Sequence, residues 1–156
     1  MPVVVPPRGT RGVKFPIPGG RIGAFMTSIM AFLGRHGVRI QGRPLLQLIT
    51  LGAKSGLERR TVLGWFDDPS NPKARLIVGS FAGAAVHPAW FLNLAKHPDA
   101  VQMEDAAGRV AVSVATVEGA ERDAAWAGIA AVAPGYGSYE TKTDREIPII
   151  RLIPKA

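Results

Sequence analysis

The sequence predicts an α+β fold built on an antiparallel sheet or a small barrel. Short segments of alternating or continuous apolar residues, typical of β-strands, recur from residue 45 to the end of the chain. Helical patterns interrupt them at only two places, which favours hairpin connections over regular βαβ units. The chain has 156 residues, the length of one domain, and a domain of this size buries roughly 68–70% of its unfolded surface. One hydrophobic core can therefore form without disulfides or a structural metal.

The composition narrows the functional classes. Apolar residues make up 47% and charged residues 20% of the chain, as expected for a globular protein. The absence of cysteine excludes disulfides, thiolate metal sites and cysteine nucleophiles. The three histidines lack metal-binding spacing, so we expect no bound metal. The sequence shows neither a signal-peptide pattern nor the roughly 20 consecutive apolar residues that span a bilayer. We therefore expect a cytoplasmic protein.

Positive charge is concentrated in the first third of the chain. The net charge is +7, yet residues 1–57 contain eight Lys and Arg and no acid, while the eleven cations and twelve acids of residues 58–156 sum to −1. Such asymmetry indicates an anionic partner: a membrane surface, a nucleic acid or an acidic small molecule. We expect no nucleic acid, because the sequence has neither a helix-turn-helix nor strands with interleaved aromatic residues.

The first predicted elements are an extended arm and a helix. Residues 1–20 contain five prolines and four glycines without periodicity, which predicts an arm that precedes a single domain at residues 21–156. Within that domain, residues 21–36 place apolar side chains at helical spacing, with arginine near both ends. Two roles stay open for this helix. It packs on the core, or it lies on a membrane surface or lines an apolar ligand channel.

Strands and two further helices follow. The segment at 67–73 carries Asp, Asn and Pro as turn residues. A helix at 87–97 has a proline near its first turn, and a helix at 119–133 has acids in its first turn and stops at Pro134. The predicted strands are 45–51, 61–66, 75–80, 101–103, 109–117 and 147–153.

The turn between the first two strands concentrates charge. The segment LGAKSGLERRTVLGWF, residues 51–66, carries Lys54 and Ser55 in a glycine-bounded turn and then Arg59 and Arg60. One interpretation is a solvated hairpin turn. The other is an anion cradle, in which turn amides, lysine and arginine hold a phosphate or carboxylate.

Three motifs keep their order and spacing over about residues 45–153: TLGAKSGLERRTVLGW, VGSFAGAAVHPAWFLNLAKHPDAV and GYGSYETKTDREIPIIRL. Together they resemble the deazaflavin-dependent nitroreductase family of actinobacterial reductases. The resemblance implies a split β-barrel, like that of flavin mononucleotide-binding proteins, and coenzyme F420 (an 8-hydroxy-5-deazaflavin) as the cofactor. This coenzyme carries a phosphodiester and a polyglutamate tail, and the cations of the turn suit such a tail.

The resemblance also implies which residues bind the coenzyme. Five positions depart from the family pattern: Ala53 stands where a basic residue is frequent, Glu58 and Val62 stand where proline is common, and Phe81 and Ala82 replace a polar residue and a glycine. Without the resemblance, the tryptophan of the helix at 87–97 would be interpreted as a core residue. The implied coenzyme-binding residues are Lys54, Ser55, Gly56, Arg59, Arg60, Thr61, Leu63, Ser80, Gly83, Trp90 and Asn93.

Two tyrosines are the candidate catalytic residues. Tyr136 and Tyr139 lie three residues apart after Pro134, a spacing that a simple loop closure also gives. In the family, tyrosines of this segment wall the substrate pocket, where they orient the acceptor or provide a proton. Ala133 and Lys142 stand where some members have tyrosine and tryptophan, so we expect a pocket unlike that of the nitroimidazole-activating members.

The leading functional hypothesis is a reductase that moves hydride from reduced F420 to an electron-poor quinone, enone or nitro compound. If the N-terminal helix contacts anionic lipid at the inner face of the cell membrane, a menaquinone-like acceptor is expected. The competing hypothesis is a non-catalytic carrier of a cofactor, lipid or fatty acid on the same barrel. A flavin mononucleotide or haem-type ligand in a related barrel is a third. The sequence leaves monomer and dimer open.

Overall fold

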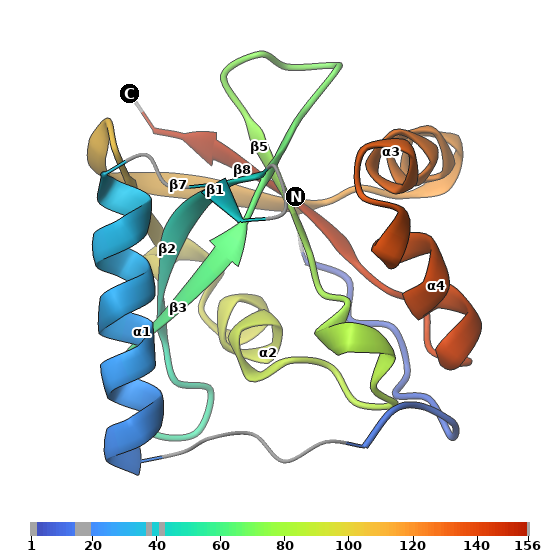
Figure 1. Ribbon diagram of the computed structural model, residues 1–156, viewed down its shortest axis with the longest axis horizontal. Coiled ribbons are helices and arrows are strands. Elements are labelled where there is room, and N and C mark those ends of the chain that lie inside the picture. Colours follow the sequence, from blue (N-terminus) through green and yellow to red (C-terminus); the bar gives the residue numbers. More distant parts are fainter. Residues whose placement is uncertain (1–2, 15–19, 37–38, 41–42, 156) are drawn as a thin grey trace.

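The computed structural model describes residues 3–14, 20–36, 39–40 and 43–155 (Figure 1). Eight strands of the described chain form one sheet: β1 (Arg39–Ile40), β2 (Arg43–Leu51), β3 (Glu58–Gly64), β4 (Phe66–Asp67), β5 (Arg75–Val78), β6 (Gln102–Asp105), β7 (Gly108–Thr116) and β8 (Ile149–Pro154). Their order is β1-β2-β6-β7-β8-β5-β4, with β3 paired to β2 outside this path. Every one of these pairings is antiparallel.

Helices accompany the sheet, so the predicted α+β class is confirmed. They are α1 (Gly20–Arg35), α2 (Ala89–Lys96), α3 (Gly119–Val132) and α4 (Pro134–Lys142), with short 3-10 helices η1 (Phe81–Gly83) and η2 (Pro98–Ala100). The helix predicted at 87–97 begins only at Ala89, because Pro88 is extended with ψ 148°. The sequence did not predict α4. Pro134 ends α3 and also starts α4, since proline fits the first position of a helix.

The main core lies between the curled sheet and α2. Phe91 and Leu94 of α2 are fully buried in one cluster with residues of five strands, among them Leu48, Ile77 and Leu152. Strand β2 is buried along nearly its whole length because α1 contacts it as well as α2. Burial on both faces explains why the apolar residues of β2 (Leu45, Leu46, Leu48 and Ile49) do not alternate with exposed polar ones, and even Gln47 and Thr50 are buried.

A second core joins α3 and α4 to the other end of the sheet. Trp126 and Ile129 of α3 are buried against Ile147 and Ile149, which lie before and within β8. The Trp126 indole N–H donates a 2.8 Å hydrogen bond to the carboxylate of Glu140 on α4. This bond and the packing hold α4, and with it the two candidate tyrosines, in a fixed place.

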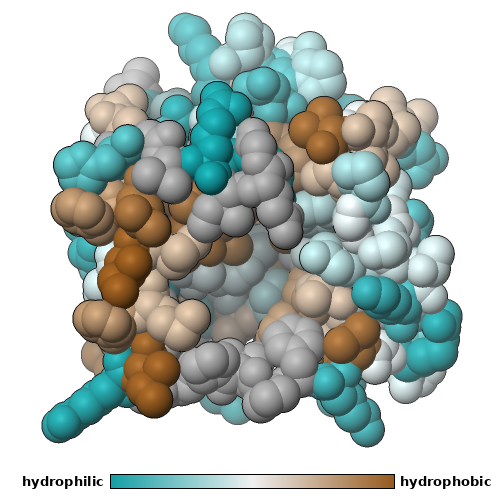
Figure 2. All heavy atoms as spheres, viewed as in Figure 1, coloured by the Kyte–Doolittle hydropathy of each residue, from teal (hydrophilic) through white to brown (hydrophobic). Residues whose placement is uncertain are grey.

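Helix α1 packs against the outer side of β2 and β3 and keeps an apolar face in solvent (Figures 1 and 2). Its residue Ala31 is buried, at 6% exposure. The apolar stripe, as we call the large exposed side chains of this helix, is between 43% and 69% exposed and comprises Ile22, Phe25, Met26, Ile29 and Phe32. The helix therefore both covers the sheet and presents an apolar surface.

Residues 3–14 have no helix or strand and run along η1 and the segment before β8. The Gly9 N–H donates to the Ala85 carbonyl at 2.7 Å, and the Asp144 carboxylate accepts bonds from the backbone amides of Thr10 and Arg11, each at 2.9 Å. A side chain at Gly12 would place its Cβ 2.2 Å from the Ala85 nitrogen. Only glycine permits this close approach. The division of the chain at residue 20 stays a prediction.

Candidate active site

Two adjoining cavities lie between β3 and α2, and the face in Figure 2 is hollowed near its centre, over the region where these elements lie in Figure 1. The basic cavity has about 460 Å³ and is lined by the turn between β2 and β3, the start of β3 and α2. The second cavity has about 400 Å³ and reaches from β3 to η1 and α4. We call it the ring-side cavity, because the rings of Trp90 and Tyr136 line it. Both cavities are lined by Thr61, Ala89 and Trp90, so they adjoin at these residues, and we call the two together the cleft.

The turn of the basic cavity is a compact, internally bonded loop. The Gly52 N–H donates to the Leu57 carbonyl and the Gly56 N–H to the Gly52 carbonyl, both at 2.8 Å. Gly56 has φ +68°, a conformation that favours glycine. The Ser55 hydroxyl accepts a bond from the Leu57 N–H at 3.2 Å. These bonds fix the loop so that the side chains of Lys54 and Ser55 extend from a defined backbone.

Asn93 connects this turn to α2. Its side chain is buried, and its Oδ1 accepts a 2.8 Å hydrogen bond from the Ala53 N–H. Its Nδ2 lies 3.5 Å from the Thr50 hydroxyl on β2, at the limit of hydrogen bonding. Asn93 therefore sets the width of the basic cavity by holding its two walls together.

The cations of the basic cavity differ in their partners. Arg60 forms an ion pair with Glu58 at 2.7 Å and donates a bond to Gln47. The pKa of Glu58 is lowered, chiefly by the hydrogen bond that Arg60 donates to the Glu58 carboxylate. Within the described residues, Lys54 and Arg59 form no ion pair, and both are exposed. In the basic cavity, the positive charges of Lys54 and Arg59 are therefore not neutralised by a neighbouring acid of the described chain.

The ring-side cavity is largely apolar, and a buried arginine holds its turn in place. Leu63, Val78 and Trp90 contribute apolar walls, and Ser80 the start of the turn. Arg145, 4% exposed, donates hydrogen bonds to the carbonyls of Ser80 at 2.9 Å and of Gly79 and Ala84 at 3.0 Å. The guanidinium so fixes η1, where Phe81 and Ala82 adopt positive φ angles of 44° and 50°. Arg145 lies in the third motif, but its role there was not predicted from the sequence.

Tyr136 lines the ring-side cavity from α4. Its hydroxyl accepts a hydrogen bond from Nη1 of Arg43 at the start of β2, and the Arg43 guanidinium lies 4.8 Å from the tyrosine ring centroid. The pKa of Tyr136 is raised, chiefly by burial, so the phenol keeps its proton at neutral pH. The sequence marks Arg43 only as one of the N-terminal cations, because its contact with Tyr136 joins residues 93 positions apart.

The structure brings most of the predicted site residues into the cleft. Gly56, Gly83 and Tyr139 line neither cavity. Gly83 has φ +82° in η1, and a Cβ there would lie 3.0 Å from the Tyr139 carbonyl oxygen; Tyr139 itself packs against Tyr136 with ring centroids 5.3 Å apart. Among the described residues, no group of three acids or histidines is arranged to hold a metal. The predicted residues that line the cleft are Lys54, Ser55, Arg59, Arg60, Thr61, Leu63, Ser80, Trp90, Asn93 and Tyr136.

Comparison with known proteins identifies the family. The family model described as F420H(2)-dependent quinone reductase matches residues 24–154, most of the chain. The chain belongs to this family. A solved structure of an F420-H2 dependent reductase, FDR-A, is 32% identical with a TM-score of 0.61, and the match covers 74% of this chain and 99% of that one.

Further solved structures agree on the fold of this F420H2-dependent quinone reductase family. A domain-swapped dimer is 29% identical with a TM-score of 0.62 and covers 84% of this chain and 96% of its own. Campylobacter jejuni ChuZ, at 16% identity and a TM-score of 0.53, shares the fold alone. The predicted split β-barrel is confirmed, and so is the class of enzyme: the chain is an F420H2-dependent reductase. The non-catalytic carrier hypothesis is not favoured.

Proposed function

We propose that the cleft binds coenzyme F420 along its length, with the anionic tail over the basic cavity and the deazaflavin ring in the ring-side cavity. One observation supports this most: the two cavities adjoin, with Lys54 and Arg59, which form no ion pair within the described residues, at one end and a tyrosine at the other. When bound and reduced, the coenzyme supplies a hydride. The protein holds its ends, excludes water and positions an acceptor quinone beside Tyr136.

The residues fit such a ligand in charge and shape. Lys54 and Arg59 can pair with phosphodiester or carboxylate oxygens without first breaking an ion pair, and Ser55 adds a hydroxyl. The apolar walls around Leu63 and Trp90 suit a flat ring. Each cavity has a volume in the range of about 300–1,000 Å³ that small-molecule sites occupy.

Tyr136 is the proposed source of the proton. Reduction of a quinone to a hydroquinone by one hydride also consumes one proton, and a phenol that stays protonated can donate it to an oxygen that becomes negative. Arg43, which donates to the Tyr136 hydroxyl, stabilises the phenolate left behind. Solvent then returns the proton to Tyr136. For Tyr139, which packs behind Tyr136, we propose a supporting role.

Helix α1 indicates which kind of quinone is the acceptor, because its surface suits contact with a membrane. We propose peripheral contact with an anionic membrane through the apolar stripe, with Arg21 and Lys14, both exposed, facing the headgroups. Within the described part of the chain, no helix is long and apolar enough to cross a bilayer. A menaquinone-like acceptor could then pass from the lipid to the enzyme, which would work at the inner face of the cytoplasmic membrane.

The proposed reaction is tested by steady-state absorbance measurements. Reduced coenzyme F420 is mixed with the protein and either a naphthoquinone, an enone or a nitroaromatic compound. We expect oxidation of the coenzyme with the quinone at a rate proportional to enzyme. Binding of the reduced coenzyme without oxidation by any of the three acceptors would instead support a carrier.

A further inference from the structure

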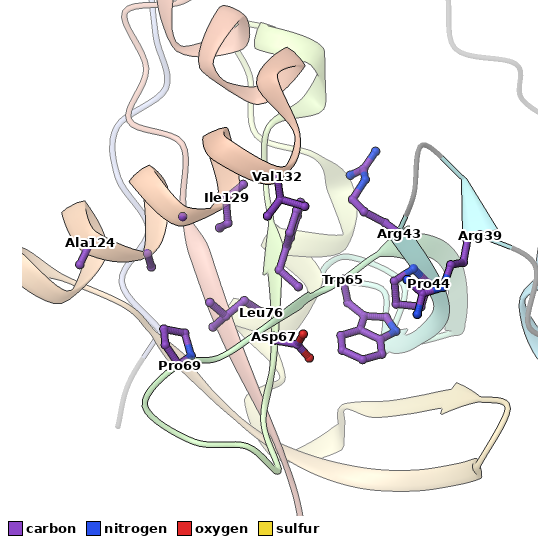
Figure 3. A pocket seen from close by; sticks show the side chains of 13 residues that line it. Arg39, Arg43, Pro44, Trp65, Asp67, Pro69, Leu76, Ala124, Ile129 and Val132 are labelled. Atoms are coloured by element: carbon purple, nitrogen blue, oxygen red, sulfur yellow. The ribbon is translucent and has the colours of Figure 1, made fainter.

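A third cavity, which the coenzyme cleft does not use, lies between α3 and the β2–β4 side of the sheet (Figure 3). Its volume is about 410 Å³. We call it the side cavity. Its walls are largely apolar, with two arginines and one aspartate among the lining residues. Its lining residues include Arg43, Trp65, Phe66, Gly128, Ile129 and Val132.

Helix α3 presents one face to this cavity. The lining positions 124, 125, 128, 129 and 132 follow the three- and four-residue spacing of one helical face. Gly128 lies in the middle of this face, is exposed, and a Cβ added there meets nothing within 4 Å. Ala127, one position earlier, is also exposed but does not line the cavity. The side cavity is therefore open to solvent at Gly128, with room there for a larger side chain.

Arg43 and Tyr136 stand at the border between the side cavity and the ring-side cavity. Arg43 lines the side cavity and donates a hydrogen bond to Tyr136, which lines the ring-side cavity. A Cβ on Gly64, another ring-side residue, would lie 3.3 Å from Nη1 of Arg43. Phe66 of the side cavity meets the Tyr136 ring edge-on, with centroids 5.4 Å apart. The two cavities are thus neighbours that share one polar contact.

This position fits an acceptor with a polar head and an apolar substituent. Hydride transfer requires the acceptor ring to reach about 3–3.5 Å from the donor atom. The polar head must therefore lie in the ring-side cavity, beside the proposed position of the coenzyme ring. The oxygen of that head becomes negative as the hydride arrives, and the Arg43 charge stabilises it in a buried setting. An apolar substituent of the head extends from this point past Phe66 toward Ile129 and Val132.

We propose that the side cavity binds the apolar substituent of a prenylated or alkylated quinone, while Arg43 and Tyr136 hold its head beside the coenzyme ring. The inference rests on the proposed function and adds a subsite to it. The reaction is then balanced as follows: the quinone gains a hydride and a proton, the coenzyme loses the hydride, and Tyr136 is reprotonated from water. The bound coenzyme is the reductant.

The test compares two leucine substitutions on α3. In Gly128→Leu the new side chain occupies the side cavity, and in Ala127→Leu, the matched control, it extends into solvent. Both favour the helix, because leucine is a good helix former. Binding of 1,4-naphthoquinone and of the same ring with one prenyl substituent is measured on the protein without coenzyme, by quenching of tryptophan fluorescence. Trp65 lies in the wall of the side cavity and Trp90 in that of the ring-side cavity, so Trp65→Phe should remove the additional quenching that the prenyl substituent causes.

We expect Gly128→Leu to weaken binding of the prenylated quinone by at least about tenfold. Two methylene groups of the prenyl substituent that stay in water instead of being buried already cost that much affinity. Binding of the unsubstituted quinone should stay unchanged, and Ala127→Leu should alter neither. Equal affinity of Gly128→Leu and wild type for the prenylated quinone, or equal losses for both quinones, would overturn the proposal. Coenzyme F420 titration of the same variants is read separately, so a failure to bind coenzyme refutes the proposed function and not the subsite.

Discussion

Nη1 of Arg145 lies 3.0 Å from Nδ1 of His87, and both side chains are buried. Because an arginine only donates, Nδ1 must be the acceptor and carry no proton. The other ring nitrogen, Nε2, lies 2.7 Å from the Pro6 carbonyl and is therefore the protonated one. His87 is held as the neutral imidazole that connects the N-terminal arm to the arginine under the ring-side turn.

This contact predicts a loss of stability in mild acid. The pKa of His87 is lowered from 6.5, chiefly by burial, so the folded chain binds fewer protons than the unfolded chain just below that pH. The free energy of unfolding should therefore fall as the pH drops from about 6.5 through the lower pKa of the folded state. Urea unfolding of wild type and His87→Gln at a series of pH values measures it. The variant, which cannot titrate there, should lack this part of the slope; identical slopes would refute the assignment.

The basic cavity predicts a tail-dependent loss of affinity. Lys54→Ala or Arg59→Ala should weaken coenzyme binding by about 1–3 kcal/mol, the usual range for charge-assisted contacts, and less at high salt. Arg60→Ala is the matched control and should have a smaller effect, because Glu58 already neutralises Arg60. The measurement is a titration with long-tailed coenzyme and with the tail-less chromophore. The same loss for both ligands would place Lys54 and Arg59 away from the tail.

The two tyrosines predict unequal effects on turnover. Tyr136→Phe removes a proton donor in the ring-side cavity and should lower kcat by about 10²-fold, the lower end of the effect of general acids, with coenzyme affinity little changed. Tyr139→Phe keeps the ring that packs on Tyr136 and should leave kcat nearly unaltered. Stopped-flow oxidation of the reduced coenzyme by a naphthoquinone reports both. A full rate in Tyr136→Phe would mean that the proton comes from water.

The apolar stripe predicts salt-sensitive binding to anionic vesicles. Phe25 and Phe32 are 67% and 54% exposed, so replacing both by serine should leave the fold intact and weaken vesicle binding. Val86→Ser, at an exposed position away from α1, is the control. Co-sedimentation with vesicles containing phosphatidylglycerol gives the bound fraction. If the wild-type protein stays in the supernatant at low salt, the membrane proposal is wrong and a water-soluble acceptor is favoured.

The sequence predicted the parts of the fold that local patterns determine. The strands predicted at 75–80 and 147–153 are found at Arg75–Val78 and Ile149–Pro154, because continuous apolar residues there are buried on the sheet. Helix α4 was not predicted, since PGYGSYETK contains two glycines and has no apolar periodicity. Its helical state depends on contacts with α3, such as that between Trp126 and Glu140, which no local pattern reveals.

The site shows the same division between local and distant contacts. The basic turn was predictable because all its cations lie within a few residues of one another. The pairing of Arg60 with Glu58, by contrast, depends on the direction of two side chains on β3. The border formed by Arg43 and Tyr136, and the side cavity beyond it, join α3, α4 and the start of β2, so only the folded chain brings them together.

The central claim is that the cleft binds coenzyme F420, and a fluorescence titration of the coenzyme with the purified protein tests it most directly. We expect a saturable change in coenzyme fluorescence that weakens with salt, is reduced in Lys54→Ala, and is unchanged in Gly128→Leu, whose substitution lies in the side cavity. No change in fluorescence at protein concentrations of tens of micromolar would contradict the claim.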